Sequence, residues 1–130
     1  MGNLLGNKSK IFKGILEVNM FYEFDQNNSG GWFEENDKLC AILFIEAETQ
    51  QEAVLKAENL GCYWNGVSKG IDCECCGDRW HKPYSPKVFP MGQFDNIEEY
   101  AQYLSNEYGG WTTPDVRVFY EDGTVKEFYK

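Results

Sequence analysis

Long apolar runs are absent from this sequence. No run approaches the roughly 20 apolar residues that a membrane-spanning helix needs. Lys8, Lys10 and Lys13 interrupt the N-terminal segment before it reaches the ~7 consecutive apolar residues of a secretory signal. The opening MGNLLG also lacks the Ser or Thr of a myristoylation signal. We therefore expect a cytoplasmic protein with no membrane partner.

Basic charge is scarce as well. The 130 residues contain 12 Lys and Arg against 21 Asp and Glu, which gives a formal net charge of -9. Because nucleic-acid backbones attract basic surfaces, we expect no nucleic acid as the main partner. Hydrophobic residues make up 42% of the chain and aromatic residues 16%, which is enough material for the core of one domain.

The first nineteen residues differ in character from the rest. Lysines separate apolar residues that recur at roughly helical spacing, namely Leu4, Leu5, Ile11, Phe12, Ile15 and Leu16. The pattern predicts a basic N-terminal extension over residues 1–19, helical in form. Its apolar face is expected to pack on the domain or on a second copy of the chain, so a homo-oligomer is also predicted. Residues 20–130 are predicted to form a single α+β domain.

Two strands and a helix are predicted first in that domain. The aromatic, alternating run that begins at Met20 leads into a polar, glycine-containing loop. Residues 38–48, KLCAILFIEAE, have a near-continuous apolar centre that suits a strand covered on both faces. Thr49 and Glu52 match a capping box, and Gly61 supplies a left-handed cap, so a helix is expected between them.

A second helix and a hairpin are predicted towards the C-terminus. Residues 95–110 have helical periodicity, with Asp95 as the cap and two glycines at the end. Asp122-Gly123 favours a two-residue type I′ turn, which pairs Tyr120 with Val125. The element order predicts an α+β, two-layer fold. In it a mainly antiparallel sheet carries two helices on one face, and a cysteine-rich insert lies between the helices.

Five cysteines, an odd number, occur in the chain. In a reducing cytoplasm their thiols stay reduced, so a disulfide framework is not expected. Three of them fall within IDCECCGDRWH, residues 71–81, inside an insert over residues 61–93. A loop of that length in a small domain is typical of a functional or cross-linked segment.

Structural zinc is one interpretation of this insert. Cys73 and Cys76 form a C-x-x-C pair followed by a glycine, which resembles a zinc knuckle. The predicted metal ligands are Cys62, Cys73, Cys76 and His81, with Cys75 or Cys40 as substitutes. Two alternatives stay open, namely reduced cysteines that bind no metal and a redox pair.

A ligand pocket is the other interpretation. Arg79 offers bidentate donors for a phosphate or carboxylate, and Trp80 offers an aromatic face for a base. The glycines of QNNSGG free backbone amides to approach an anion. The predicted ligand-binding residues are Gln26, Asn27, Asn28, Ser29, Gly30, Gly31, Tyr63, Trp64, Asn65, Arg79 and Trp80. In the alternative reading, Arg79 pairs with Asp72 or Asp78 and the aromatic residues belong to the core.

Three segments together resemble a family of small uncharacterised proteins encoded by tailed bacteriophages. They are FYEFDQNNSGGWF, FIEAETQQEAVLKAENLG and GCYWNGVSKGIDCECCGDRW. The similarity runs from about Met20 to Trp80 and continues more weakly through the C-terminal hairpin. It implies an accessory phage protein in the cytoplasm of the infected bacterial host, with no established activity to transfer.

These observations support three functional hypotheses. The first is a counter-defence protein that binds and sequesters a small anionic, nucleotide-like ligand without catalysis. The second is a zinc-braced interaction module that docks on a host protein and inhibits it. The third and least favoured is a small phosphodiesterase or nuclease, because His81 is the single histidine and no nucleophile with a base and an orienting carboxylate stands out.

Overall fold

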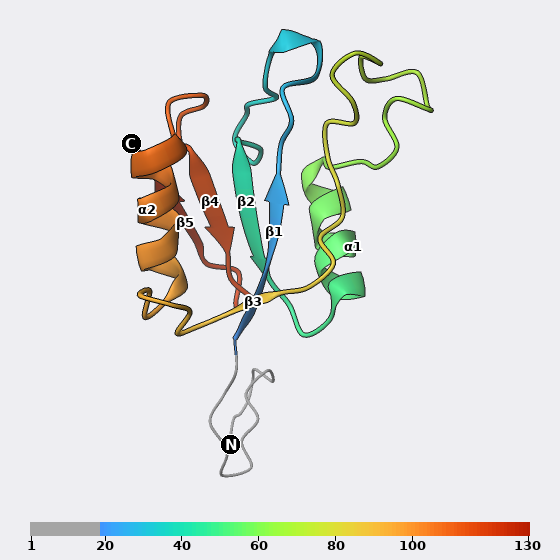
Figure 1. The fold of residues 1–130 in the computed structure, drawn as a ribbon. Helices are drawn as coiled ribbons and strands as arrows, with labels where there is room; N and C mark the ends of the chain where they lie inside the picture. Colours follow the sequence, from blue (N-terminus) through green and yellow to red (C-terminus); the bar gives the residue numbers. More distant parts are fainter. Residues whose placement is uncertain (1–18) are drawn as a thin grey trace.

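The computed structural model describes residues 19–130, so the predicted extension lies, apart from Asn19, outside the described residues. The elements are β1 (Met20–Asp25), the short 3-10 helix η1 (Ser29–Gly31), β2 (Ile42–Glu46), α1 (Gln50–Leu60), β3 (Lys87–Val88), α2 (Ile97–Tyr108), β4 (Val116–Phe119) and β5 (Val125–Phe128). They form a five-stranded sheet in the order β3-β1-β2-β4-β5 (Figure 1). Only the β2 and β4 pairing is parallel among these neighbours. The predicted α+β class and mainly antiparallel sheet are confirmed.

The two helices cover opposite faces of the sheet, which corrects the predicted arrangement on one face (Figure 1). Successive residues of a strand point to opposite faces. On β2, Ile45 accordingly belongs to a core with Ala53 and Ala57 of α1. Its neighbour Phe44 belongs to a second core with Ala101 of α2. The architecture therefore has three layers, with the sheet in the middle.

Local sequence explains the ends of α1. The Thr49 side chain accepts a hydrogen bond from the Glu52 backbone N–H (3.1 Å), which satisfies one of the free donors of the first turn. Gly61 closes the helix at a φ of +121°, and its backbone N–H donates to the Ala57 carbonyl (3.1 Å). Both predicted caps are confirmed.

The cap of α2 lies one residue later than predicted. Asn96, not Asp95, accepts the hydrogen bond from the Glu99 backbone N–H (2.9 Å). The backbone N–H of Asp95 donates instead to the Glu99 carboxylate (2.8 Å). Glu99 therefore bonds on both sides of the cap, through its backbone N–H to the Asn96 side chain and through its carboxylate to the backbone of the residue before the cap.

The C-terminal hairpin is also shifted by one residue. Phe119, and not Tyr120, lies opposite Val125. Tyr120 instead donates its backbone N–H to the Thr124 carbonyl (2.8 Å), so residues 121–123 form the loop. Gly123 has a φ of +94°, as expected for a three-residue hairpin loop that ends in a left-handed glycine.

The segment between α1 and β3 contains no helix or strand over residues 61–86. It lies beside α1 and passes close to the loop that follows β1, at one end of the sheet (Figure 1). No described helix is both long enough and apolar enough to cross a bilayer. The cysteine-rich segment, Cys73 to Cys76, lies between the two helices in the chain, as predicted.

Candidate functional site

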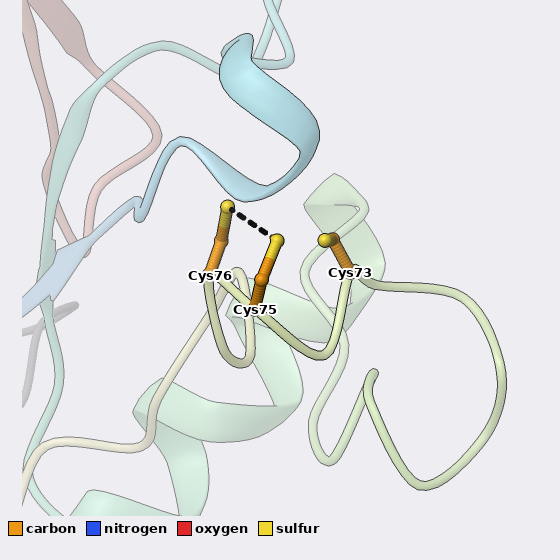
Figure 2. Close-up of side chains that lie close together, drawn as sticks. All are labelled: Cys73, Cys75 and Cys76. Atoms are coloured by element: carbon orange, nitrogen blue, oxygen red, sulfur yellow. Dashed lines mark hydrogen bonds between the residues drawn. The ribbon is translucent and has the colours of Figure 1, made fainter.

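Three cysteine side chains converge at one exposed turn of the insert. The sulfur atoms of Cys73, Cys75 and Cys76 lie within 4.8 Å of one another (Figure 2). The turn is closed by the backbone N–H groups of Cys76 and Gly77, which both donate to the Cys73 carbonyl (3.2 and 3.0 Å). Gly77 adopts a φ of +89°, a conformation that favours glycine. The sequence C-x-x-C-G therefore brings the thiols together through backbone geometry.

The loop after β1 holds this turn in place. The Cys73 backbone N–H donates to the Ser29 hydroxyl (2.9 Å). The Asn27 side-chain amide donates to the Cys76 and Asp78 carbonyls. The Asn27 backbone N–H also donates to the Arg79 carbonyl (2.8 Å). Since Asn27 follows the end of β1 by two residues, the cysteine turn is attached to the sheet at short range.

Arg79 lies beneath the turn and is 2% exposed. Its guanidinium donates to the Gln26 side-chain oxygen (2.9 Å), to the Trp32 carbonyl (2.8 Å) and to the Ser29 carbonyl (2.9 Å). The Nε–H donates to the Tyr63 hydroxyl (3.3 Å). Protein acceptors thus occupy all three guanidinium nitrogens, and the predicted use of Arg79 as an anion ligand finds no support in this geometry.

Two further partners complete the environment of Arg79. The carboxylate of Asp72, with a side chain 1% exposed, lies 3.9 Å from the Arg79 Nε and accepts from the Arg79 backbone N–H (2.8 Å). The exposed Trp32 ring lies over the guanidinium, with 4.1 Å between the guanidinium carbon and the ring centre. The pairing with Asp72 was one of the two alternatives that the sequence offered. Asp78 instead accepts from the Val67 backbone N–H (2.8 Å).

The environment separates the thiols by acidity. Hydrogen bonds from the Cys75 thiol and from the Cys75 and Cys76 backbone N–H groups lower the pKa of Cys73. The same contact with Cys73 raises the pKa of Cys75 to about 11. Burial raises the pKa of Cys62 and of Cys40 to about 12. Cys73 is therefore the thiol best suited to become a thiolate, which is the form that binds metals.

The predicted metal ligands do not come together as one set. The structure groups Cys75 with Cys73 and Cys76, and that described group contains neither Cys62 nor His81. Cys62 is buried in the core that packs on α1. His81 lines a pocket on the insert. Cys75, which was predicted as a substitute ligand, therefore takes the place of Cys62 in the group of three.

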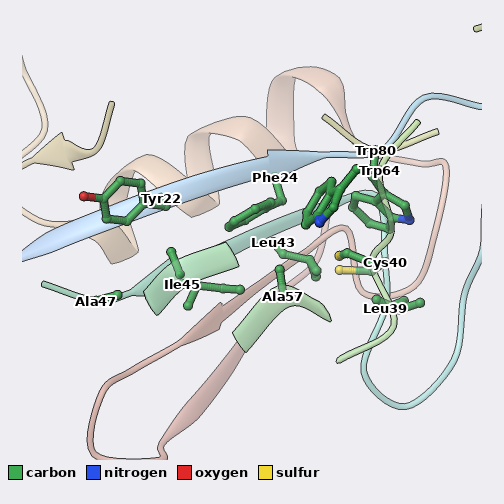
Figure 3. Close-up of a cluster of buried hydrophobic side chains, with 12 residues drawn as sticks. Tyr22, Phe24, Leu39, Cys40, Leu43, Ile45, Ala47, Ala57, Trp64 and Trp80 are labelled. Atoms are coloured by element: carbon green, nitrogen blue, oxygen red, sulfur yellow. The ribbon is translucent and has the colours of Figure 1, made fainter. Parts of the chain in front are cut away.

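The predicted ligand-binding residues also divide into two places. Trp64, Asn65 and Trp80 line a pocket of about 460 Å³, together with Gln50, Asp78, His81, Lys82 and Tyr84. The rings of Trp64 and Trp80 belong to the core beside Phe24 and Leu43 (Figure 3). Gln26, Asn27, Ser29 and Tyr63 instead surround Arg79. Asn28, Gly30 and Gly31 form and flank η1.

Sequence reasoning missed two contributors to the site. Trp32, which stacks on Arg79, lies in a stretch for which the sequence predicts a loop and no ligand or core contact. Gly66 is packed against Asp72 and Tyr63 so closely that a Cβ at this position would overlap the Asp72 carboxylate. The signal available for Trp32 was an aromatic residue directly after the polar stretch QNNSGG. For Gly66 the sequence contained none, because its φ does not require glycine.

Comparison with known proteins gives one match. No curated protein and no solved structure matches the chain. The model of a family described as a domain of unknown function, DUF7296, matches residues 19–130. This range contains the sheet, both helices and the cysteine turn. The chain therefore belongs to the DUF7296 family.

Proposed function

We propose that this domain is a non-catalytic binding module that holds one zinc ion on Cys73, Cys75 and Cys76 and docks on another protein through the surface around that ion. The observation that carries the proposal is the convergence of three thiol groups to within 4.8 Å at an exposed turn. Soft thiolate ligands favour zinc among the common divalent cations of cells.

The spacing of the sulfur atoms supports zinc. A Zn–S bond is about 2.3 Å long, so two thiolates of a tetrahedral site are about 3.8 Å apart. The sulfur atoms of Cys75 and Cys76 are 3.6 Å apart. Only small side-chain movements are needed for three thiolates to bind one ion. Three ligands leave the fourth position open, which is the position that a partner can fill.

Exposed apolar residues on the segments that form and hold the cysteine turn support the docking surface. Trp32 is 55% exposed and follows the loop that holds the cysteine turn. Ile71 is 59% exposed and precedes Cys73 by two residues. Buried aromatic anchors supply much of the binding energy in protein interfaces. The resemblance to bacteriophage accessory proteins makes a host protein in the bacterial cytoplasm the proposed partner.

Cobalt and zinc titration of the reduced protein tests the metal site. We expect one equivalent of Co²⁺ to give a thiolate charge-transfer band, and zinc to displace it. Cys73→Ser should abolish the band. Cys62→Ala is the matched control, since it removes a thiol that lies outside the group, and it should retain the band. Absence of a cobalt band in the wild type, with free thiols verified, would refute the zinc site.

The docking surface is tested separately. We expect capture of a host protein that is lost on chelation and in Trp32→Ala, and kept in Lys69→Ala, an exposed control on the same insert. Sedimentation with and without zinc would detect a second copy as the partner instead. Capture that does not depend on metal or on Trp32 would contradict the proposed surface.

A second candidate function is the binding of a small anionic, ring-containing ligand. The pocket of about 460 Å³ favours it, because Lys82 and His81 stand at the same cavity as the Trp64 ring. Cavities of about 300–1,000 Å³ are usual for small-molecule sites. Lys82 lies 5.7 Å from the centre of the Trp64 ring. The cation in this version is Lys82, in place of the predicted Arg79.

Calorimetry with a panel of cyclic and ADP-ribose-type nucleotides tests this candidate. We expect saturable binding that Lys82→Ala weakens and Lys69→Ala leaves unchanged. Because neither lysine belongs to the cysteine turn, loss of zinc should leave this binding intact. Failure of every nucleotide in the panel to bind would remove the candidate and leave the interaction module.

A further inference from the structure

A second cavity lies on the face of the sheet that α2 covers, away from the cysteine turn. It has a volume of about 370 Å³. Its floor is formed by β1 and β2 and its sides by α2 and by two loops, which contribute Phe33 and Trp111. Of the residues already described around Arg79, only Gln26 also lines this cavity, and the volume falls in the range of small-molecule sites.

Aromatic rings form much of its wall. Phe33 and Trp111 lie with their ring centres 5.7 Å apart and their planes tilted by 32°. Trp111 is 65% exposed and Tyr108, the last residue of α2, is 61% exposed. Large aromatic side chains that remain exposed around a cavity offer ring faces to a ligand, and such faces attract organic cations.

Two carboxyl groups lie on the floor. Glu23 and Asp25 are two residues apart on β1, so both point to the same face of the sheet. Lys87 of β3 lies 3.6 Å from the Glu23 carboxylate. Among the described residues Asp25 forms no ion pair, but its side chain is hydrogen-bonded to Glu23, and the charge of Lys87 lowers its pKa. The described lining contains no Lys or Arg.

We propose that this cavity binds an organic ammonium ion, with Asp25 and Glu23 as counter-ions and the rings of Phe33, Tyr108 and Trp111 as its walls. An anion is disfavoured because the lining contains two carboxyl groups and the chain is strongly acidic. A bare Mg²⁺ or Ca²⁺ requires about six or more oxygen ligands, which this mainly aromatic and aliphatic lining does not provide.

The protonation of Asp25 supports the same ligand class. Asp25 is an exposed residue at the end of β1, and the groups packed around its carboxyl group together with the neighbouring Glu23 raise its pKa to about 8, while Lys87 opposes this shift. The raised pKa favours the protonated form of Asp25. The titratable groups of α2 near Asp25 and its cavity are Tyr100 and Tyr108. A bound ammonium ion would supply the positive charge beside Asp25 that the proton otherwise supplies. We therefore expect the ammonium ion to displace the proton.

Choline and its neutral carbon isostere, dimethylbutanol, are the probes for the full-length chain. By calorimetry we expect saturable binding of choline and no measurable binding of the isostere. Asp25→Asn should weaken choline binding by roughly tenfold, and Trp111→Ala by about two- to five-fold. Asp37→Asn is the control, because it makes the same substitution at another exposed position, outside the cavity.

The pH dependence provides a second readout that does not depend on folding of the variants. Choline should bind more tightly as the pH rises through about 8, because Asp25 then loses its proton without assistance from the ligand. Below that pH, binding should release a proton, which calorimetry in buffers of different ionisation enthalpy detects. Equal binding of the isostere, or binding that neither pH nor Asp25→Asn alters, would overturn the proposal. Neither result bears on the cysteine turn.

Discussion

Replacement of the buried arginine separates a structural role from a ligand-binding role. In Arg79→Ala, the Asp72 carboxylate loses its charged partner inside the protein, and three carbonyl or amide oxygens lose a donor. If Arg79 were instead a surface residue that binds an anion, its removal would cost little stability and would abolish binding of the anion. The two roles therefore predict different free energies of unfolding.

The magnitude follows from the burial of the pair. Removal of one partner of a buried ion pair typically costs about 3–5 kcal/mol. Asp72 keeps its hydrogen bond from the Tyr63 hydroxyl (2.6 Å), so we expect the lower end, about 3 kcal/mol. Small domains are stable by about 5–15 kcal/mol in total. The variant should therefore fold but unfold at a much lower urea concentration.

Urea unfolding followed by tryptophan fluorescence measures this loss. Lys69→Ala, an exposed substitution in the same insert, should change the free energy of unfolding by less than about 0.5 kcal/mol. The double variant Asp72→Asn, Arg79→Ala should lose less free energy of unfolding than the sum of the two single variants. In the double variant no unpaired carboxylate charge remains buried. An Arg79→Ala variant as stable as the Lys69→Ala control would refute the structural role.

Three further predictions concern single positions. Gly66→Ala should destabilise the protein by about 1–3 kcal/mol in urea unfolding, because its Cβ overlaps the Asp72 carboxylate; an unchanged midpoint would contradict the close packing. Limited alkylation at neutral pH should modify Cys73 before Cys62, whose pKa of about 12 and burial protect it, and peptide mass mapping that finds Cys62 first would contradict this order. The folded state binds the Asp25 proton more tightly than the unfolded chain, so stability should fall as the pH rises from about 4 to about 8, and Asp25→Asn should remove this part of the pH dependence. Unfolding curves of the two proteins that keep the same pH slope would refute it.

Secondary structure was predictable where the deciding signal is local. The caps of α1 depend on Thr49 and Gly61, which act on backbone groups within four residues, and both are confirmed. The hairpin was predicted one residue out of register, because an Asp-Gly pair fits both a two-residue and a three-residue loop. The choice between the two loop lengths depends on contacts beyond the loop, among them the burial of Val116 and Val118 in the core beside α2.

The placement of the helices depends on contacts that sequence periodicity does not record. The apolar run from Cys40 to Ile45 indicated a strand covered on both faces, which is how β2 lies. Each helix has one apolar stripe, however, and the stripe does not identify the face that it covers. The chain crosses the sheet from β2 through α1 to β3, and then in the opposite direction from β3 through α2 to β4. Because crossovers between parallel strands are right-handed, two crossovers in opposite directions place their helices on opposite faces.

The candidate site was only partly predictable for a similar reason. Cys73 and Cys76 are brought together by a short turn, and their proximity follows from the spacing C-x-x-C-G. Cys62 is adjacent to Gly61 at the end of α1, and the direction in which the chain leaves that cap points its thiol into the core. The sequence could not choose between Asp72 and Asp78 for Arg79, because both lie within seven residues of it.

The polar network around Arg79 explains why a long insert without helix or strand is held in one arrangement. The insert was expected to need a function or a cross-link, and zinc was the expected cross-link. Arg79 instead joins the insert to the loop after β1 through Gln26 and Ser29, below the thiols. The cysteines therefore lie on a support that does not depend on a metal ion. We therefore expect the proposed zinc ion to bind and to be removed while the domain stays folded, which unfolding curves with and without chelator would test.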